Sequence, residues 1–266
     1  MTQAIQKKLN DSAFARWTAL ILVALTMFFG YMFVDVLSPL QNMLESTRGW
    51  SPTIFGLYGG SEFILNVCGF LLVAGIILDK MGVRFTGILS ASLMVLGAGI
   101  KFYGLSNYFY EGGFGYEFLS SFLTDIPASA KLACLGFMVF GCGTEMAGVT
   151  VSRAIVKWFT GKELALAMGL EMAIARLGVF AVFSLSPWVA NWGGDPSVAR
   201  PVAVVGLLLC IGLLTYIAFS VMDFKLDRQT EADTPIGETE EPFKVADLKN
   251  LFSSKTFLIV SALCVL

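Results

Sequence analysis

Five ionisable side chains interrupt long apolar runs of the sequence. They are Asp35, Glu62, Glu145, Glu171 and Arg176. A charged group at membrane depth costs about 2.5–3.5 kcal/mol on insertion scales, so such residues usually face a protein interior or a water-filled cavity. If the apolar runs cross a bilayer, these five side chains are the first candidates for binding a polar solute or exchanging a proton.

Glu145 and Arg176 form the best-matched pair, because their spacing puts them at a similar depth. At a rise of 1.5 Å per residue, Glu145 lies about 18 Å from Lys157, and Arg176 lies about 21 Å from Lys162. Arginine binds a carboxylate through paired hydrogen bonds, and a carboxylate binds an ammonium group. An amino acid or short peptide carries both groups, so it fits the pair. The alternative is that Glu145 and Arg176 neutralise each other as an interhelical ion pair.

The other three acids have less defined expected roles. Glu171 lies about 14 Å along a helix from Lys162, where it could form a gate or pair with Arg153 or another loop cation. Asp35 and Glu62 are placed nearer the expected outer side. They are interpreted as an outer vestibule or proton-exchange groups, with satisfaction by backbone or hydroxyl groups as the equal alternative.

The composition predicts that these residues stand on membrane-spanning helices. Of the 266 residues, 56% are hydrophobic and 14% are charged, against roughly 45–50% and about 25% in soluble domains. About 20 apolar residues suffice to cross a bilayer, and six runs qualify: 17–43, 53–77, 85–104, 132–156, 164–189 and 199–222. A seventh run, 251–266, ends inside apolar sequence, which predicts that the native chain continues. The expected fold class is an all-α membrane protein.

The loops between these runs predict the orientation. Lys and Arg concentrate in the loops that share a side with the N-terminus, so the positive-inside rule places the tail 1–16 in the cytoplasm. The acidic segment 223–250 is expected to be a cytoplasmic linker. The connector 105–130 is rich in Tyr and Phe, which suits the headgroup level of the membrane. The tail has no acidic dileucine signal, which favours a bacterial plasma membrane over a lysosome.

Several classes of function are disfavoured by what the sequence lacks. It contains no histidine, the commonest transition-metal ligand and general base. It contains no G-x-x-x-x-G-K-[ST] loop, so no ATP-driven motor is indicated. The five cysteines all fall in apolar runs without a CxxC motif and are interpreted as packing residues. We therefore expect no metal, no cofactor, no enzymatic activity and no nucleic-acid partner.

The segment GIILDKMGVR stands between the second and third runs and is expected to make a tight helix reversal. Gly75 and Gly82 suit close backbone approach and unusual dihedral angles. Asp79 is expected to accept hydrogen bonds from a helix N-terminus. Lys80 and Arg84 are expected to anchor the cytoplasmic face.

The pattern G-x-x-x-D-K-x-G-x-R in this segment resembles the loop signature of the major facilitator superfamily, departing from it at Val83. The resemblance implies the six-helix N-terminal half, a 3+3 inverted repeat, of a twelve-helix fold whose second half is missing here. It also implies that the loop contacts that second half. The run KWFTGKELALAMGLEMAIARLG resembles the lysosomal dipeptide transporter branch. In that branch an acid on span four and the arginine of A-R-x-G receive the two peptide ends, which implies these roles for Glu145 and Arg176.

These observations predict a secondary transporter that moves short peptides or amino acids by alternating access. An alternative is a proton-coupled carrier of organic anions, in which Arg176 holds the anion and Asp35 or Glu145 takes the proton. A non-transporting membrane scaffold is a third possibility. The expected partners are a small solute, the lipid bilayer and the missing six-helix half.

Overall fold

The computed structural model describes residues 8–231, 253–256 and 259. The chain forms two compact units, Met1–Asp233 and Thr234–Leu266. In the second unit, Ser253, Lys255, Thr256 and Ile259 are helical. Most of the expected seventh span, 251–266, and the expected linker beyond residue 231 lie outside the described residues.

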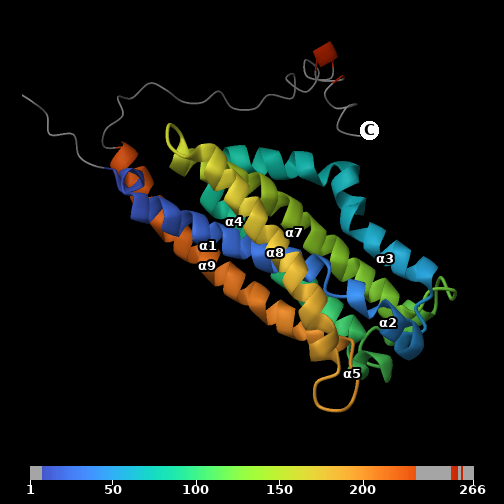
Figure 1. Ribbon diagram of the computed structural model, residues 1–266. Helices are drawn as coiled ribbons and strands as arrows, with labels where there is room; N and C mark the ends of the chain where they lie inside the picture. Colours follow the sequence, from blue (N-terminus) through green and yellow to red (C-terminus); the bar gives the residue numbers. More distant parts are fainter. Residues whose placement is uncertain (1–7, 232–252, 257–258, 260–266) are drawn as a thin grey trace, which may run out of the picture. The chain divides into compact units, whose positions relative to one another are not determined.

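Every regular element between residues 8 and 231 is helical (Figure 1). The elements are η1 (Leu9–Asp11), α1 (Ala13–Val34), η2 (Ser38–Leu40), α2 (Gln41–Arg48), α3 (Pro52–Leu65), η3 (Asn66–Phe70), α4 (Leu71–Leu105), α5 (Asn107–Tyr110), α6 (Tyr116–Ser120), α7 (Ala128–Phe159), α8 (Leu164–Ala190) and α9 (Ala199–Glu231). Among the described residues, 5 stretches are long and apolar enough to cross a membrane. They are Ala13–Arg48, Pro52–Leu105, Ala128–Phe159, Leu164–Ala190 and Ala199–Thr230.

The stretch Pro52–Leu105 spans 54 residues and is interrupted at two glycines. Gly69 has a φ of 107° within η3, a π-helix, and Gly82 has a φ of 74° and a ψ of 175° within α4. Positive φ values of this kind are open to glycine at little steric cost. Figure 1 shows the chain changing direction at η3, between α3 and α4.

The segment around Gly82 confirms one sequence expectation and corrects two. Gly82 has the predicted unusual dihedral angles. Gly75 makes no close approach, since a Cβ there would meet open space, and it lies inside α4. Asp79 caps no helix: it also lies inside α4, and Arg153 of α7 donates a hydrogen bond to its carboxylate. The ion pair with α7 replaces the expected cap.

The first apolar run is divided near its C-terminal end. Helix α1 stops at Val34, and Asp35 takes the C-cap position. A short 3-10 turn with Pro39 follows before α2 begins. Proline fixes φ and lacks an amide hydrogen, so a single helix over 17–43 does not form. This division places the Asp35 carboxylate at a helix end.

Glycines let the helices of this unit approach closely. Helix α4 packs against α7 and α9, and α1 packs against α8 and α9. A Cβ at Gly97 of α4 would overlap the Phe140 nitrogen and Gly136 oxygen of α7. A Cβ at Gly178 of α8 would overlap the Phe28 oxygen of α1. These backbone contacts hold α4 on α7 and α8 on α1.

Charged side chains join the helices at the end of the unit that carries Gly82. Arg84 forms an ion pair with Asp227 at 3.2 Å. Asp223 is 1% exposed and receives the Lys157 ammonium at 2.8 Å and the Trp158 indole N–H at 2.9 Å. Helix α9 therefore continues to Glu231, nine residues beyond the run predicted to end at 222.

The segment before α1 is held at the same end. Arg16, 6% exposed, donates to the Asn10 carbonyl at 3.0 Å and to the Glu163 carboxylate at 3.1 Å. Lys162 donates to Asp11 at 2.9 Å, and this hydrogen bond holds the pKa of the Asp11 carboxyl below its ordinary value. These contacts join the N-terminal segment to the loop between α7 and α8.

Candidate functional site

Four of the five predicted intramembrane residues line one cavity of about 230 Å³, which we call the acidic cavity. The four are Asp35, Glu62, Glu145 and Arg176. Tyr31, Val34, Phe63 and Thr144 complete the lining. Helices α1, α3, α7 and α8 each contribute to it. Three carboxylates and one guanidinium thus share a small polar space inside a bundle of apolar helices.

Glu62 is positioned by a close approach between α3 and α7. A Cβ at Gly141 of α7 would overlap the Glu62 backbone oxygen, so the absent side chain lets α3 lie against α7. One turn later, the Asn66 amide donates to the carbonyl oxygens of Glu62 and Gly141, each at 3.3 Å. This link fixes α3 where the helix becomes the π-helix η3. The Glu62 side chain is 4% exposed and therefore has little freedom to leave the cavity.

Asp35 enters the cavity from the end of α1. The Ser38 hydroxyl donates to its carboxylate at 3.0 Å, from the turn that follows the helix. Satisfaction by a hydroxyl group was one of the two alternatives for this acid, and Ser38 supplies that hydroxyl. Asp35 nevertheless faces the cavity, where its remaining acceptor positions are available.

Arg176 extends from α8 across the ring of Tyr31, with the guanidinium carbon 5.2 Å from the ring centroid. Among the described residues, no direct ion pair joins Arg176 to Glu145 or to another carboxylate. The structure brings Glu145 and Arg176 into one cavity without letting them neutralise each other. Arginine keeps its five N–H donors for a planar acceptor such as a carboxylate.

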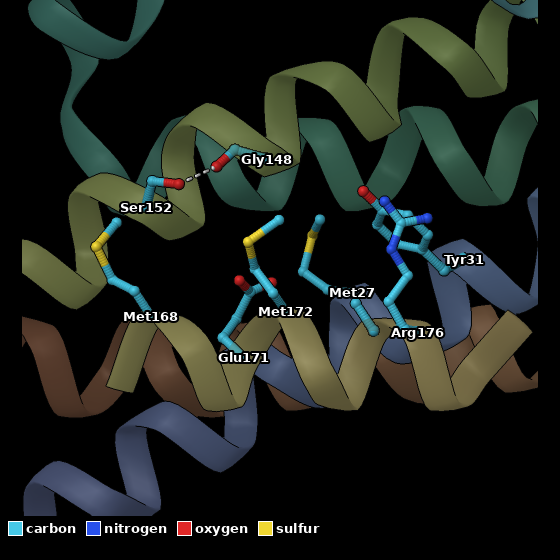
Figure 2. A pocket seen from close by; sticks show the side chains of 9 residues that line it. Met27, Tyr31, Gly148, Ser152, Met168, Glu171, Met172 and Arg176 are labelled. Carbon is cyan, nitrogen blue, oxygen red and sulfur yellow. Dashed lines mark hydrogen bonds between the residues drawn. The ribbon is translucent and has the colours of Figure 1, made fainter. Parts of the chain in front are cut away.

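A second cavity of about 230 Å³ adjoins the first and shares Tyr31 and Arg176 with it. Met27, Met168 and Met172 line it together with Glu171, and we call it the methionine cavity. Figure 2 shows Arg176 beside Tyr31 at one end and Met168 at the other, with Glu171 between them. Methionine side chains are flexible and adapt to ligands of different shape.

Glu171 faces the methionine cavity and is separate from the other acids. It does not line the acidic cavity, and its carboxylate forms no ion pair or hydrogen bond with the described residues. Arg153, which the sequence offered as a partner for Glu171, pairs with Asp79. Glu171 and Arg176 therefore both line the methionine cavity from α8, whereas only Arg176 also lines the acidic cavity.

Lys101 is a buried charge that the sequence analysis did not select. It belongs to the last turns of α4 and is 0% exposed. Its ammonium lies 4.4 Å from the ring centroids of Phe33 and Phe137 and 5.0 Å from that of Tyr58. By sequence it lies three residues before the end of the predicted run 85–104. Only the packing of α1, α3 and α7 around it reveals that it is enclosed.

The family to which the chain belongs identifies the class of protein that contains these cavities. The model of the major facilitator superfamily matches residues 20–266, which include every helix that lines them. The chain belongs to the major facilitator superfamily. It is therefore a multi-pass membrane protein of a transporter family rather than an enzyme.

Individual relatives point to one branch of the major facilitator superfamily. The chain is 31% identical to the lysosomal dipeptide transporter MFSD1 of Gallus gallus over 135 residues, 49% of this chain and 30% of the relative. It is 26% identical to the MFSD1 of Pongo abelii over 256 residues, 92% of this chain and 49% of the relative. The chain thus spans at most about half the length of these relatives. No solved structure matches it significantly.

Proposed function

We propose that the protein is a secondary transporter for short peptides or amino acids, with the acidic cavity as its solute site. The observation that carries the proposal is the placement of an unpaired arginine and three carboxylates around one cavity inside the membrane-spanning bundle. The free carboxylate of the solute binds Arg176, and its ammonium group binds Glu145. The printed names of the relatives, which describe dipeptide transporters, support this substrate class.

The proposed architecture is the N-terminal six-span half of a twelve-span protein, built as a 3+3 inverted repeat. The break at Gly82 supports counting Pro52–Leu105 as two crossings. With the N-terminus in the cytoplasm, the Gly82 turn and its ion pairs lie at the inner face. The aligned region covers only 49% of the Pongo abelii relative, which leaves room for a second half. In the proposed architecture this second half closes the cavity from the other side. Transport follows when the two halves rock around the site near the membrane midplane.

The membrane in which the protein works is also a proposal. The relatives are named as lysosomal proteins. The N-terminal segment of this chain has no acidic dileucine signal, which favours a bacterial plasma membrane.

The test uses the full-length protein in liposomes and the dipeptide Ala-Ala with free or blocked ends. We expect Arg176→Ala to reduce Ala-Ala uptake at least about tenfold, because one good charged hydrogen-bonded pair corresponds to about 1.5–3 kcal/mol. Amidation of the peptide carboxylate removes the same contact. The wild type should therefore discriminate against the amide, and Arg176→Ala should not.

Arg200→Ala is the matched control. Arg200 begins α9 and donates to the carbonyl oxygens of Ala190, Trp192 and Asp195, away from both cavities. Its loss should leave the discrimination between Ala-Ala and its amide intact. If the wild type takes up no dipeptide, or if Arg176→Ala retains wild-type discrimination, the proposed site is wrong.

A proton-coupled carrier of organic anions is a second candidate, which one observation favours. Glu62 is 4% exposed, and its carboxylate forms no hydrogen bond or ion pair with the described residues. Such a group is suited to accept a proton. An imposed pH gradient separates the two candidates, because it drives accumulation only in a proton-coupled carrier.

A further inference from the structure

The residues that line the acidic cavity include more acidic groups than basic ones. The lining holds three carboxyl groups, those of Asp35, Glu62 and Glu145, and one guanidinium group, that of Arg176. Three carboxylates against one guanidinium leave two negative charges without a counter-charge in the lining. Charges inside a membrane protein are normally paired with one another or with backbone carbonyls. The structure must therefore supply a further positive charge nearby or leave the cavity strongly negative.

Lys101 is the only fully buried lysine among the described residues, and its ring neighbours Phe33 and Tyr58 belong to helices that line this cavity. Two members of its aromatic enclosure identify its position. Phe33 adjoins the cavity residue Val34 on α1, and Tyr58 stands one helical turn before Glu62 on α3. Lys101 is therefore enclosed beside α1 and α3, two of the helices that line the cavity, although none of its three ring neighbours lines the cavity itself.

The surroundings of Lys101 favour a cation but offer it no anion in contact. Three ring faces lie within 4.4–5.0 Å of the ammonium, as cation–π interactions require. Its hydrogen-bond acceptor is the Phe33 carbonyl, at the long distance of 3.5 Å. Among the described residues, no carboxylate forms an ion pair with Lys101. No direct ion pair with a described carboxylate therefore cancels its charge.

Resting on the proposed function, we propose that Lys101 is a specificity-determining residue that sets which net charge of peptide the acidic cavity accepts. Lys101 does not line the cavity, and the rings of Phe33, Tyr58 and Phe137 surround its ammonium group. It acts through its field, which offsets one of the two unbalanced negative charges. With Lys101 present the cavity tolerates neutral zwitterionic peptides. Without it the cavity prefers peptides with an added positive charge.

The experiment measures binding of three dipeptides to the full-length protein in detergent: Lys-Ala, Ala-Ala and Ala-Glu. These peptides carry one positive net charge, none and one negative net charge. We expect Lys101→Met to raise the affinity ratio of Lys-Ala to Ala-Glu at least about tenfold, because charges several ångströms apart interact strongly at a low effective dielectric constant. Methionine has a similar length and fits the apolar enclosure. Lys101→Arg, which keeps the charge, should leave the ratio near its wild-type value.

Two further variants separate the effect of charge from an effect of structure. Lys131→Met is the matched control: Lys131 donates to the carbonyl oxygens of Leu119 and Phe122 and does not line the cavity. It should not change the ratio. The double variant Lys101→Met/Glu62→Gln removes one charge of each sign and should restore the wild-type ratio. A packing defect at position 101 would not be repaired by a change at position 62.

The outcomes distinguish this inference from the proposed function. If the wild type binds dipeptides and Arg176→Ala abolishes the binding, but Lys101→Met leaves the ratio unchanged, Lys101 has no role in specificity. If no dipeptide binds the wild type, the proposed function itself fails, and this inference fails with it. Should Lys101→Met not fold, the double variant decides. If the double variant then has the wild-type affinity ratio of Lys-Ala to Ala-Glu, the proposal is supported. If it has the same ratio as the single variant Glu62→Gln, the proposal is contradicted.

Discussion

Asp223 shows how much a single buried acid contributes at the end of the bundle that carries Gly82. Its carboxylate accepts hydrogen bonds from Lys157 and Trp158 of α7 at 2.8 Å and 2.9 Å. Only 1% of its side chain is exposed, whereas the neighbouring Asp227 side chain is 29% exposed. An unpartnered buried donor costs about 1–3 kcal/mol, whereas an exposed ion pair contributes at most about 1 kcal/mol. The two acids should therefore differ strongly in their effect on stability.

We predict that Asp223→Ala lowers the free energy of unfolding by about 2–3 kcal/mol, because it leaves the Trp158 indole buried without an acceptor. Asp227→Ala should lower it by about 1 kcal/mol or less, since Lys157 keeps its bond to Asp223. Unfolding in detergent, followed by tryptophan fluorescence, measures both. Equal losses in the two variants would contradict the assignment of the buried hydrogen bonds to Asp223.

At the residue scale, the part of the site that follows from helix rise could be predicted. Counting along two helices put Glu145 and Arg176 at one depth, and the two residues do share a cavity. The same method could not find Lys101, because its burial depends on rings from three other helices. Nor could it decide whether Glu145 and Arg176 pair directly, which depends on the side-chain placement over Tyr31.

At the element scale, the contact between α4 and α7 depends on glycines that face the partner helix. Gly97 and Gly99 stand two residues apart on α4 and differ in their surroundings. A Cβ at Gly97 would overlap the α7 backbone, whereas a Cβ at Gly99 would meet no atom within 4 Å. Because both residues are glycines inside α4, replacing each with alanine changes helix propensity in a similar way. A difference in stability between the two variants therefore reports packing against α7.

We predict that Gly97→Ala destabilises the protein by about 1–3 kcal/mol or more, because α4 and α7 must separate to admit the methyl group. Gly99→Ala should be neutral or stabilising by up to about 1 kcal/mol, since alanine favours a helix over glycine. Thermal unfolding of the two purified variants gives the comparison. Loss of stability in Gly99→Ala of the same size would show that backbone freedom, and not the α4–α7 contact, explains both results.

The helices themselves could be predicted from apolar runs, but only some of their interruptions could. A run of 20 apolar residues has one low-energy conformation in a bilayer, so the positions of α7, α8 and α9 follow from hydropathy. The break after Val34 has a local cause in Pro39, and the turn at Gly82 was predicted, whereas the π-helix at Asn66 depends on contacts made after folding. Asn66 bonds the Gly141 carbonyl of α7, a partner that no local pattern identifies. Likewise, α9 extends past 222 because α7 and Arg84 supply cations to Asp223 and Asp227.

At the scale of the whole molecule, the stretch Pro52–Leu105 decides the topology. If its 54 residues cross the membrane twice, with Gly82 at the inner turn, both of its ends lie on the outer side. If they cross once, its ends lie on opposite sides. The length permits either arrangement, because about 20 residues suffice for one crossing. The inverted-repeat architecture requires two crossings.

We predict that single cysteines at Ser46 and Asp125 react with a membrane-impermeant maleimide added outside intact cells, and that one at Met81 does not. All three positions are exposed, so accessibility within the protein does not limit the reaction. Met81 should react only after the membrane is permeabilised, because the proposed topology puts the Gly82 turn at the cytoplasmic face. A variant with its native cysteines replaced by serine gives the background. Labelling of Ser46 and Asp125 from opposite sides would establish a single crossing and remove the basis for a six-span half.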